Sequence, residues 1–364
     1  MAKLNGAKLI SVSGLGGKMP ACFVLEMNGK RIMLDLGEGP EPGIYPDLTH
    51  VGDVDCIVLS HAHMDHADAL HLRPQIGNPP VYATRTTWSF LEDAPVAEAD
   101  RRFLPDQGKC LIEGLAAQTG RCGHSPGGIW VHFSDHGGVT YTGDWSVESN
   151  LLPFDMPPVA DTLLTDASYG DRDQALEDQF SKIYNACEDG AVLCVPSHGR
   201  GPEMALAFLA RGHIPRLGKS IYAEIEQLLD NETLYDVTQK PVLKALLQQQ
   251  DYSTAFSIDD IIITTEANAE SGHSAELLAE FGANGNFIFT GHVPDNTPAK
   301  TMLTNGTAQW FAWNVHPRQR DVIAIADQTR ARFVLPAFVD PQKAENLFTI
   351  LGERLCCENE LILP

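Results

Sequence analysis

The chain has 364 residues, of which 43% are hydrophobic and 20% charged, a composition typical of a folded globular protein and not of a disordered one. This length predicts about two domains. The formal net charge of -22 argues against non-specific adhesion to nucleic acid, because phosphate binding draws on an excess of Lys and Arg; a nuclease that holds its substrate through metal ions and a few arginines stays compatible with it.

Eight cysteines are present, but none forms a C-x-x-C pair, and most have apolar neighbours, as Cys56 and Cys194 do. We therefore expect buried, reduced thiols and no disulfide framework, which favours a reducing compartment. The N-terminal residues do not resemble a secretory signal, and no apolar run approaches the length of about eighteen residues that a spanning helix requires. The sequence thus predicts a soluble, cytoplasmic protein without a membrane partner.

The first third of the chain alternates short apolar strands with helices. Short apolar runs and turn residues predict strands at residues 8–13, 22–26, 31–36, 54–60 and 80–83. The dipeptide Asn28-Gly29 predicts a tight hairpin turn between the second and third of these strands. Helices are expected at residues 67–75 and 84–92, the latter capped by Thr84.

The predicted secondary structure changes from mainly strands to alternating helices and strands after about residue 170. Strands are expected at residues 129–134, 139–142 and 161–166. Beyond them, helices at 174–188, 203–211, 237–250 and 273–281 alternate with apolar strands at 191–195, 261–264 and 286–290. This alternation is typical of a parallel α/β domain. A last strand at 332–336 precedes a helix at 341–355, which has Pro341 in its first turn.

Four potential metal ligands lie within six residues, His61, His63, Asp65 and His66. In an extended segment, residues two apart point the same way, so His61 and His63 can converge on one metal ion while Asp65 and His66 turn toward a second. Imidazoles and carboxylates are ligands that Zn²⁺ accepts. Single histidines are usually core or surface residues, but such a cluster rarely arises by chance, so we predict a metal site here.

Two later motifs supply further ligands in the expected order. His124 lies in the run Gly-His-Ser-Pro-Gly, and Asp144 lies in the run Thr-Gly-Asp-Trp at the end of a predicted strand. A loop histidine and a strand-end aspartate would complete a centre for one or two Zn²⁺ ions, with Asp144 as the bridging carboxylate. Because His and carboxylate sites accept several metals, Mn²⁺ is the alternative.

These motifs resemble those of the metallo-β-lactamase superfamily, whose HxHxDH run, later GH motif and TGD motif match His61 to His66, His124 and Asp144. The early glycines at 14–17 and Asp35 also resemble the glycine loop and structural aspartate of that superfamily. The resemblance implies an αββα sandwich, in which two β-sheets lie face to face with helices outside. It also implies a metal-dependent hydrolase.

Further motifs resemble the β-CASP nuclease branch, which includes ribonuclease J and the cleavage-and-polyadenylation endonuclease. The strand-to-helix step at 82–87, the acidic motif at 164–170 with Asp166, the steps at 199–203 and 289–292, and His316 at 314–317 carry this similarity. The resemblance implies an inserted α/β β-CASP-like domain. We therefore expect a metallo-β-lactamase domain in two parts, 1–170 and 314–364, with the insertion at 171–313.

The chain departs from the branch where its motif C usually has a histidine that binds the second metal. This chain has Phe338 after the strand at 332–336, and phenylalanine cannot bind a metal. The second site would then depend on Asp65, His66 and the bridging Asp144. A smaller departure is His292, which stands where the branch has a tyrosine.

For a phosphodiester substrate, bound zinc would activate a water molecule to hydroxide, which is the nucleophile. It would also neutralise the charge that develops on the substrate. His316 is the candidate for protonating the leaving oxygen, with Asp166 orienting it, and Asp65 orients the water or binds metal. Arg200, together with His198 and His292, is a candidate for substrate contact, since Arg suits phosphate; core or hydrogen-bonding roles remain open for the two histidines.

Three functional hypotheses remain open from the sequence. The first is a zinc-dependent nuclease acting on RNA or single-stranded DNA. The second is a non-nucleolytic hydrolase of a small phosphodiester, thioester or lactone. The third is a degenerate, non-catalytic binding subunit, which Phe338 supports and the six intact ligands oppose. The sequence does not decide between RNA and DNA, and it leaves a homo-oligomer open.

Overall fold

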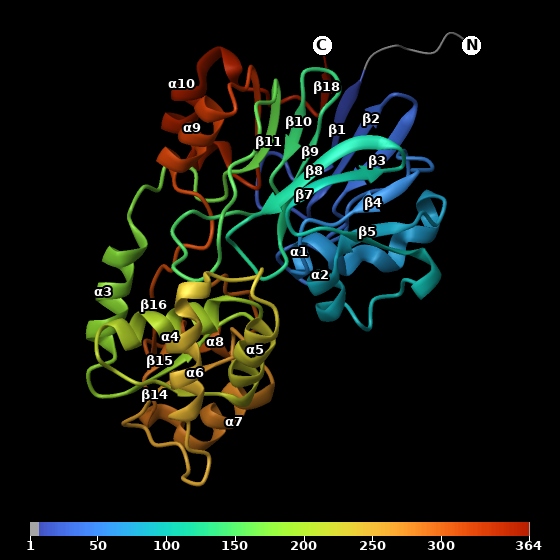
Figure 1. Ribbon diagram of the computed structural model, residues 1–364. Coiled ribbons are helices and arrows are strands. Elements are labelled where there is room, and N and C mark those ends of the chain that lie inside the picture. Colours follow the sequence, from blue (N-terminus) through green and yellow to red (C-terminus); the bar gives the residue numbers. More distant parts are fainter. Residues whose placement is uncertain (1–6, 364) are drawn as a thin grey trace. The chain divides into compact units, whose positions relative to one another are not determined.

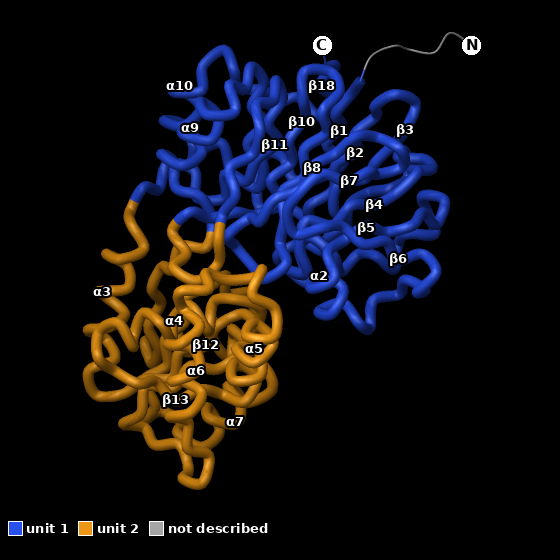
Figure 2. Tube along the Cα trace, in the orientation of Figure 1, with its two compact units in different colours: residues 1–147, 154–173, 316–364 blue, residues 148–153, 174–315 orange. Residues whose placement is uncertain are grey.

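The computed structural model describes residues 7–363. The chain divides into two compact units, coloured separately in Figure 2. The first comprises residues 1–147, 154–173 and 316–364, and the second comprises residues 148–153 and 174–315. Within residues 7–363, none of the helices has the length and apolar character needed to cross a bilayer.

The first unit contains a mixed seven-stranded sheet (Figure 1). Its strand order is β18-β1-β2-β3-β4-β5-β6. The strands β18, β1, β2 and β3 pair antiparallel, whereas β3 to β6 pair parallel. The strands are β1 (Lys8–Ser13), β2 (Cys22–Met27), β3 (Lys30–Leu34), β4 (Cys56–Val58), β5 (Val81–Thr84), β6 (Arg101–Leu104) and β18 (Glu360–Ile362).

The second sheet of this unit has six strands in the order β17-β11-β10-β9-β8-β7. The strands β17, β11 and β10 pair parallel, and β10 to β7 pair antiparallel. The strands are β7 (Gly108–Ile112), β8 (Leu115–Arg121), β9 (Ile129–Phe133), β10 (Val139–Tyr141), β11 (Thr162–Asp166) and β17 (Phe333–Ala337).

Side-chain alternation along the strands separates three apolar layers in this unit. Phe23 and Leu25 of β2 join a core that also holds Val131 and Phe133 of β9, so the two sheets pack face to face. The opposite side of β2 packs with Leu70 and other residues of the short helices that follow β4 and β5. These are α1 (Met64–Ala67), η1 (Asp68–Ile76) and α2 (Arg85–Phe90).

The outer face of the second sheet is covered by the C-terminal helices α9 (Gln319–Gln328) and α10 (Glu345–Leu351). Leu163 of β11 and Val334 of β17 pack there with Ile325 of α9 and Leu347 of α10. Helices thus lie on both outer faces of two packed sheets. The expected αββα sandwich is confirmed.

The second unit is a parallel α/β layer structure, as the alternation of strands and helices predicted. Its five strands lie in the order β13-β14-β12-β15-β16 and all pair parallel. The strands are β12 (Ala191–Cys194), β13 (Arg216–Leu217), β14 (Ile261–Thr264), β15 (Phe287–Phe289) and β16 (Ala308–Trp310). The expected inserted α/β domain is therefore present.

Helices cover both faces of this parallel sheet. On one face, Leu193 and Ile263 pack with α3 (Leu176–Ala186), α4 (Arg200–Ala210), α5 (Lys219–Asp230) and α6 (Lys240–Gln248). On the other, Val192 and Phe289 pack with α7 (Gly272–Phe281) and α8 (Pro298–Thr304). Both faces of a parallel sheet are therefore buried, which explains the continuous apolar runs of its strands.

A buried carboxylate fixes the loop that leads from β12 into α4. His198 and Gly199 both adopt positive φ angles, 72° and 121°, so their successive amide groups form a small anion-binding concavity. The Glu224 carboxylate of α5 accepts hydrogen bonds from these two amides. Burial nevertheless dominates and raises the pKa of Glu224 to about 7.

This raised pKa predicts a pH-dependent stability. Because the carboxyl is protonated more readily in the folded state, its stabilising contribution is full below the unfolded pKa of about 4.5 and is lost as pH rises through about 7. Relative to the wild type, Glu224→Gln should gain about 3 kcal/mol in unfolding free energy between these pH values. Urea unfolding at several pH values measures this, and parallel stability curves for the two proteins would contradict it.

Candidate metal centre

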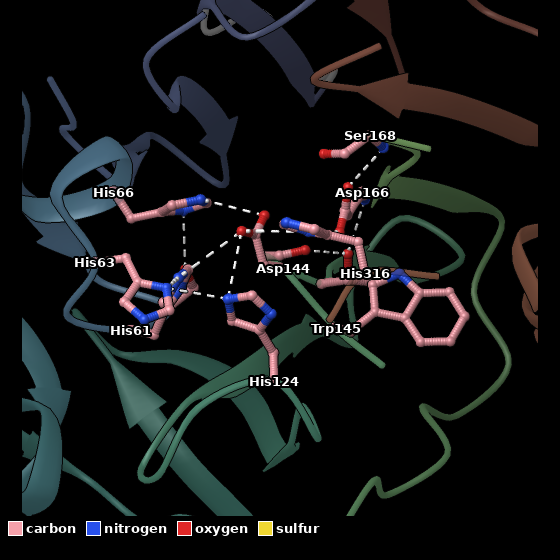
Figure 3. Close-up of polar contacts among 12 residues, drawn as sticks. His61, His63, His66, His124, Asp144, Trp145, Asp166, Ser168 and His316 are labelled. Atoms are coloured by element: carbon pink, nitrogen blue, oxygen red, sulfur yellow. Dashed lines mark hydrogen bonds and ion pairs between the residues drawn. The ribbon is translucent and has the colours of Figure 1, made fainter. Parts of the chain in front are cut away.

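The chemistry-bearing side chains singled out in the first unit follow strand ends or begin helices. Their positions are His61 and His63 after β4, His66 in α1, His124 after β8, Asp144 after β10, Asp166 at the end of β11, and His316 shortly before α9. Figure 3 shows these side chains pointing toward one another around Asp144. Segments far apart in the sequence therefore supply one polar cluster.

Three imidazoles converge at the centre of this cluster. His63 Nδ1 lies 3.0 Å from His61 Nε2 and 3.0 Å from His124 Nε2. Tetrahedral zinc with Zn–N distances of about 2.0–2.1 Å places its ligand nitrogens about 3.3 Å apart, so the spacing fits such an ion. Burial and the neighbouring imidazoles hold the pKa of His61 well below its ordinary value, which favours the neutral form that binds metals.

The Asp144 carboxylate lies among four imidazoles. Its Oδ2 is 3.6 Å from His124 Nε2, 3.9 Å from His61 Nε2 and 3.5 Å from His316 Nδ1, and its Oδ1 is 3.2 Å from His66 Nε2. Burial opposes ionisation, but the imidazoles outweigh it and hold the pKa of Asp144 well below its usual range. One oxygen of the ionised carboxylate faces His66 and the other faces the remaining three imidazoles, which is the arrangement that a ligand shared by two metal ions requires.

The potential ligand atoms form three overlapping groups within the described residues. Each group contains three atoms that lie within 4.8 Å of one another. The groups are His61 with His63 and His124, His61 with His66 and Asp144, and His124 with Asp144 and His316. The imidazoles of the first group fit one divalent ion, and the second group, which contains the Asp144 carboxylate, fits another beside it.

His66 is oriented by the buried Asp35. The Asp35 Oδ2 lies 2.7 Å from His66 Nδ1 and also accepts hydrogen bonds from the hydroxyls of Ser60 and Tyr141. This contact turns His66 Nε2 toward Asp144 and fixes which nitrogen is free to act as a ligand. Burial lowers the pKa of His66, but Asp144 and Asp35 outweigh it and raise the pKa well above its ordinary value.

Phe338 lies beside this pair and occupies the place of the missing motif C histidine. Its ring meets the His66 ring edge-on, with 5.3 Å between the centroids, and packs with Phe23. The residue has a φ of 63°, unusual for a bulky side chain, and its amide donates to the Gly14 carbonyl at 2.7 Å. Phe338 therefore presents an apolar ring to His66 at the position where the β-CASP branch has a metal ligand.

His316 and Asp166 form a second oriented pair. The Asp166 Oδ2 lies 2.7 Å from His316 Nδ1, while its Oδ1 accepts from the Ser168 amide at 2.8 Å. Burial lowers the pKa of His316, but Asp166 and Asp144 outweigh it and raise the pKa. The Tyr169 ring packs edge-on against His316, with 5.2 Å between the centroids. A histidine held in this way can carry a proton at its other nitrogen.

Asp65 lies in the first turn of α1, and its carboxylate belongs to none of the three ligand groups found within residues 7–363. Its backbone carbonyl accepts the Ala21 amide at 2.9 Å. Its side chain therefore has less geometric support as a ligand than the other members of the run.

The predicted substrate contacts His198, Arg200 and His292 belong to the second unit. His198 and Arg200 follow β12, and His292 follows β15. Arg200 Nη1 lies 3.4 Å from the Thr290 hydroxyl, which brings these two strand ends together. None of the three residues is in a ligand group.

Three contacting residues were not anticipated from the sequence, namely Ser60, Tyr141 and Tyr169. Ser60 and Tyr141 directly flank predicted motifs, since they precede His61 and the Thr-Gly-Asp run. Their position next to a motif was the available signal. Tyr169 lies inside the acidic motif, but nothing local indicates that its ring meets His316.

Comparison with known proteins agrees with this geometry. The family model described as Metallo-beta-lactamase superfamily matches residues 15–180. A solved structure of a protein of unknown function from Enterococcus faecalis shares the fold over 98% of this chain and 100% of its own, with a TM-score of 0.61 and 14% identity.

Several curated proteins that are similar to this chain are named for RNA processing or transcription termination. A ribonuclease of Thermus thermophilus is 29% identical over 54% of this chain and 53% of its own. Transcription termination factor FttA of Methanosarcina mazei is 22% identical over 96% and 68%. Cleavage and polyadenylation specificity factor 73 of Drosophila melanogaster is 25% identical over 51% and 33%.

These relatives confirm the resemblance to the β-CASP nuclease branch, and their names agree with the expected class of metal-dependent hydrolase. The chain spans about half of the length of the Thermus relative and a third of the Drosophila relative.

Proposed function

We propose that this protein is a zinc-dependent phosphodiesterase of the nuclease type, acting on RNA or single-stranded DNA. The observation that carries the proposal is the convergence of the His61, His63 and His124 imidazoles, with the ionised carboxylate of Asp144 3.6 Å from His124 and 3.9 Å from His61. The names of the curated relatives support a nucleic acid as the substrate.

His61, His63, His124 and Asp144 would hold the first ion, and Asp144 with His66 would contribute to a second. Bound zinc lowers the pKa of water toward neutrality and neutralises charge on a phosphoryl group. Asp35 keeps His66 Nε2 directed at Asp144. Phe338 excludes water from one side of His66 and adds no ligand, so we expect the second position to bind metal more weakly than the first.

His316 would protonate the leaving oxygen of the phosphodiester. Asp166 accepts its Nδ1–H at 2.7 Å, which leaves Nε2 for proton transfer and stabilises the imidazolium. The Asp166 carboxylate favours the protonated form of the His316 imidazole, as an acid requires. Tyr169 limits rotation of the ring through its edge-on contact.

The proposal is tested with metal-free protein to which zinc or manganese is returned. End-labelled RNA, end-labelled single-stranded DNA and bis(4-nitrophenyl) phosphate serve as substrates in parallel. We expect chelation to abolish cleavage of a labelled strand and metal to restore it. Intact strands combined with cleavage of the small ester would overturn the nuclease proposal, and no turnover in any arm would favour a binding subunit.

The loss of rate on replacing His316 should depend on the leaving group of the substrate. His316→Ala is expected to slow cleavage of a natural phosphodiester by about 10²-fold or more, the typical contribution of a positioned acid. The nitrophenyl ester should lose much less, because nitrophenolate departs without a proton. Rates for both substrates at saturating zinc measure the difference, with His71→Ala as control, because His71 is exposed and belongs to none of the ligand groups found within residues 7–363. Equal losses on both substrates would instead assign His316 as a metal ligand.

A further inference from the structure

The second unit has an open pocket at the carboxyl ends of two neighbouring strands, β15 and β16. Its volume is about 500 Å³. It is lined by Gly291 to Val293 after β15, by Trp310 at the end of β16, and by Lys300, Leu303 and Thr304 of α8. All of these residues belong to one compact unit.

The topology of the parallel sheet places a common binding position directly beside this pocket. After β12 the chain proceeds to β13 and β14 on one side of β12, and it then crosses to β15 and β16 on the other side. The carboxyl ends of β12 and β15 are therefore a topological switch point, where open α/β sheets commonly bind ligands. The loop after β12 leads to Arg200, and the loop after β15 leads to Gly291.

Trp310 presents a fixed and exposed aromatic face in the pocket. Its indole Nε1 donates to the Gly291 carbonyl at 2.9 Å, which orients the ring. The side chain is nevertheless 47% exposed, whereas the other four tryptophans are at most 4% exposed. An indole that is held at one edge and about half exposed favours stacking with a planar ligand.

Positive charge accompanies this indole, in a chain that is strongly acidic overall. Lys300 lines the pocket and lies 3.0 Å from the exposed Asp295 carboxylate. Arg200 reaches the same strand end, because its Nη1 contacts the Thr290 hydroxyl at 3.4 Å. A Cβ on Gly291 would lie 3.2 Å from Arg200 Nη1, so glycine at this position lets the guanidinium approach.

We infer that this pocket binds one nucleotide of a single-stranded nucleic acid, with the base stacked on Trp310 and the adjoining phosphates near Lys300 and Arg200. This inference rests on the proposed nuclease function and names its substrate form. Stacking requires an unpaired base with a free face, so a duplex is a poor occupant. The combination of an aromatic platform and nearby cations is the general chemistry of single-strand binding.

Binding is measured separately from cleavage, with metal-free protein in chelator and a fluorescein-labelled oligodeoxythymidine followed by anisotropy. Trp310→Leu should weaken binding by about fivefold or more, the cost of losing one stacked base, whereas Trp310→Phe should retain most of it. Tyr252→Leu is the matched control, since Tyr252 is a 40% exposed aromatic of the same unit. Equal affinities for the Leu and Phe variants, or for the wild type and Trp310→Leu, would overturn the inference.

The phosphate contact has a different signature, the dependence of affinity on salt. Lys300→Ala should reduce the slope of log K against log salt by about 0.7, the value for one phosphate of a single strand, while the exposed Lys244→Ala should not. An unchanged slope for Lys300→Ala would remove the phosphate contact. If binding depends on Trp310 but the zinc-loaded enzyme cleaves nothing, this site stands and the nuclease proposal fails. If the enzyme cleaves but binding does not depend on Trp310, the nuclease proposal stands and this site fails.

Discussion

Asp144→Asn should reduce phosphodiester cleavage by well over a hundredfold at saturating zinc. Asparagine preserves the shape of the side chain but removes the charge that lies among four imidazoles. Loss of a group that merely orients a metal ligand typically costs about 10–100-fold, and we expect a directly shared carboxylate to cost more. The kcat/KM on a labelled strand, together with bound zinc per chain, measures the effect.

The matched control for this change is Asp327→Asn. Asp327 is an exposed aspartate of α9 that pairs with Arg354 at 2.7 Å, and its replacement should leave cleavage unaltered. If Asp144→Asn kept its activity within about threefold of the wild type, Asp144 would not be a shared ligand.

Asp35→Ala should destabilise the first unit by about 3–5 kcal/mol, the usual cost of removing one partner from a buried charged network. The Asp35 carboxylate is fully buried and accepts from the Ser60 amide, the Ser60 hydroxyl and the Tyr141 hydroxyl, in addition to its contact with His66. Alanine would leave all of these groups buried without their acceptor.

Thermal unfolding followed by circular dichroism measures this loss, which corresponds to a lowering of Tm by about 10 °C. Asp327→Ala breaks only an exposed ion pair and should cost less than about 1 kcal/mol. Asp35→Asn keeps part of the hydrogen bonding and should lie between the two. An Asp35→Ala protein as stable as Asp327→Ala would show that the network does not support the sandwich.

The ligand run could be predicted from the sequence because its chemistry is local. Four potential ligands stand within six residues, and His124 and Asp144 lie in short motifs of their own. Several strands and helices could be predicted in the same way. Thr84 caps α2 as expected, since its hydroxyl accepts a hydrogen bond from the Thr87 amide. The apolar runs in β2, β12 and β14 are likewise local patterns.

Other features depend on contacts that no local pattern encodes. The partnership of Asp35 with Tyr141 joins the residue that follows β3 of one sheet to the end of β10 in the other. Residues 148–153 belong to the second unit, where Glu148 accepts from the distant Asn314 side chain at 2.8 Å. The expected helix at 67–75 is instead the 3₁₀ helix η1, which contains Pro74. The helix α5 was missed, although Ile221, Ile225 and Leu228 recur at helical spacing.

Zinc titration of the metal-free protein by calorimetry tests the central claim most directly, with His63→Ala and His71→Ala compared in parallel. His63 Nδ1 lies at the meeting point of the three imidazoles, whereas His71 is exposed and belongs to none of the ligand groups found within residues 7–363. We predict tight binding by the wild type and His71→Ala, and binding weakened by about a hundredfold or more in His63→Ala, above the loss from an orienting group. Zinc binding that is equally tight in His63→Ala, or absent from the wild type, would contradict the account.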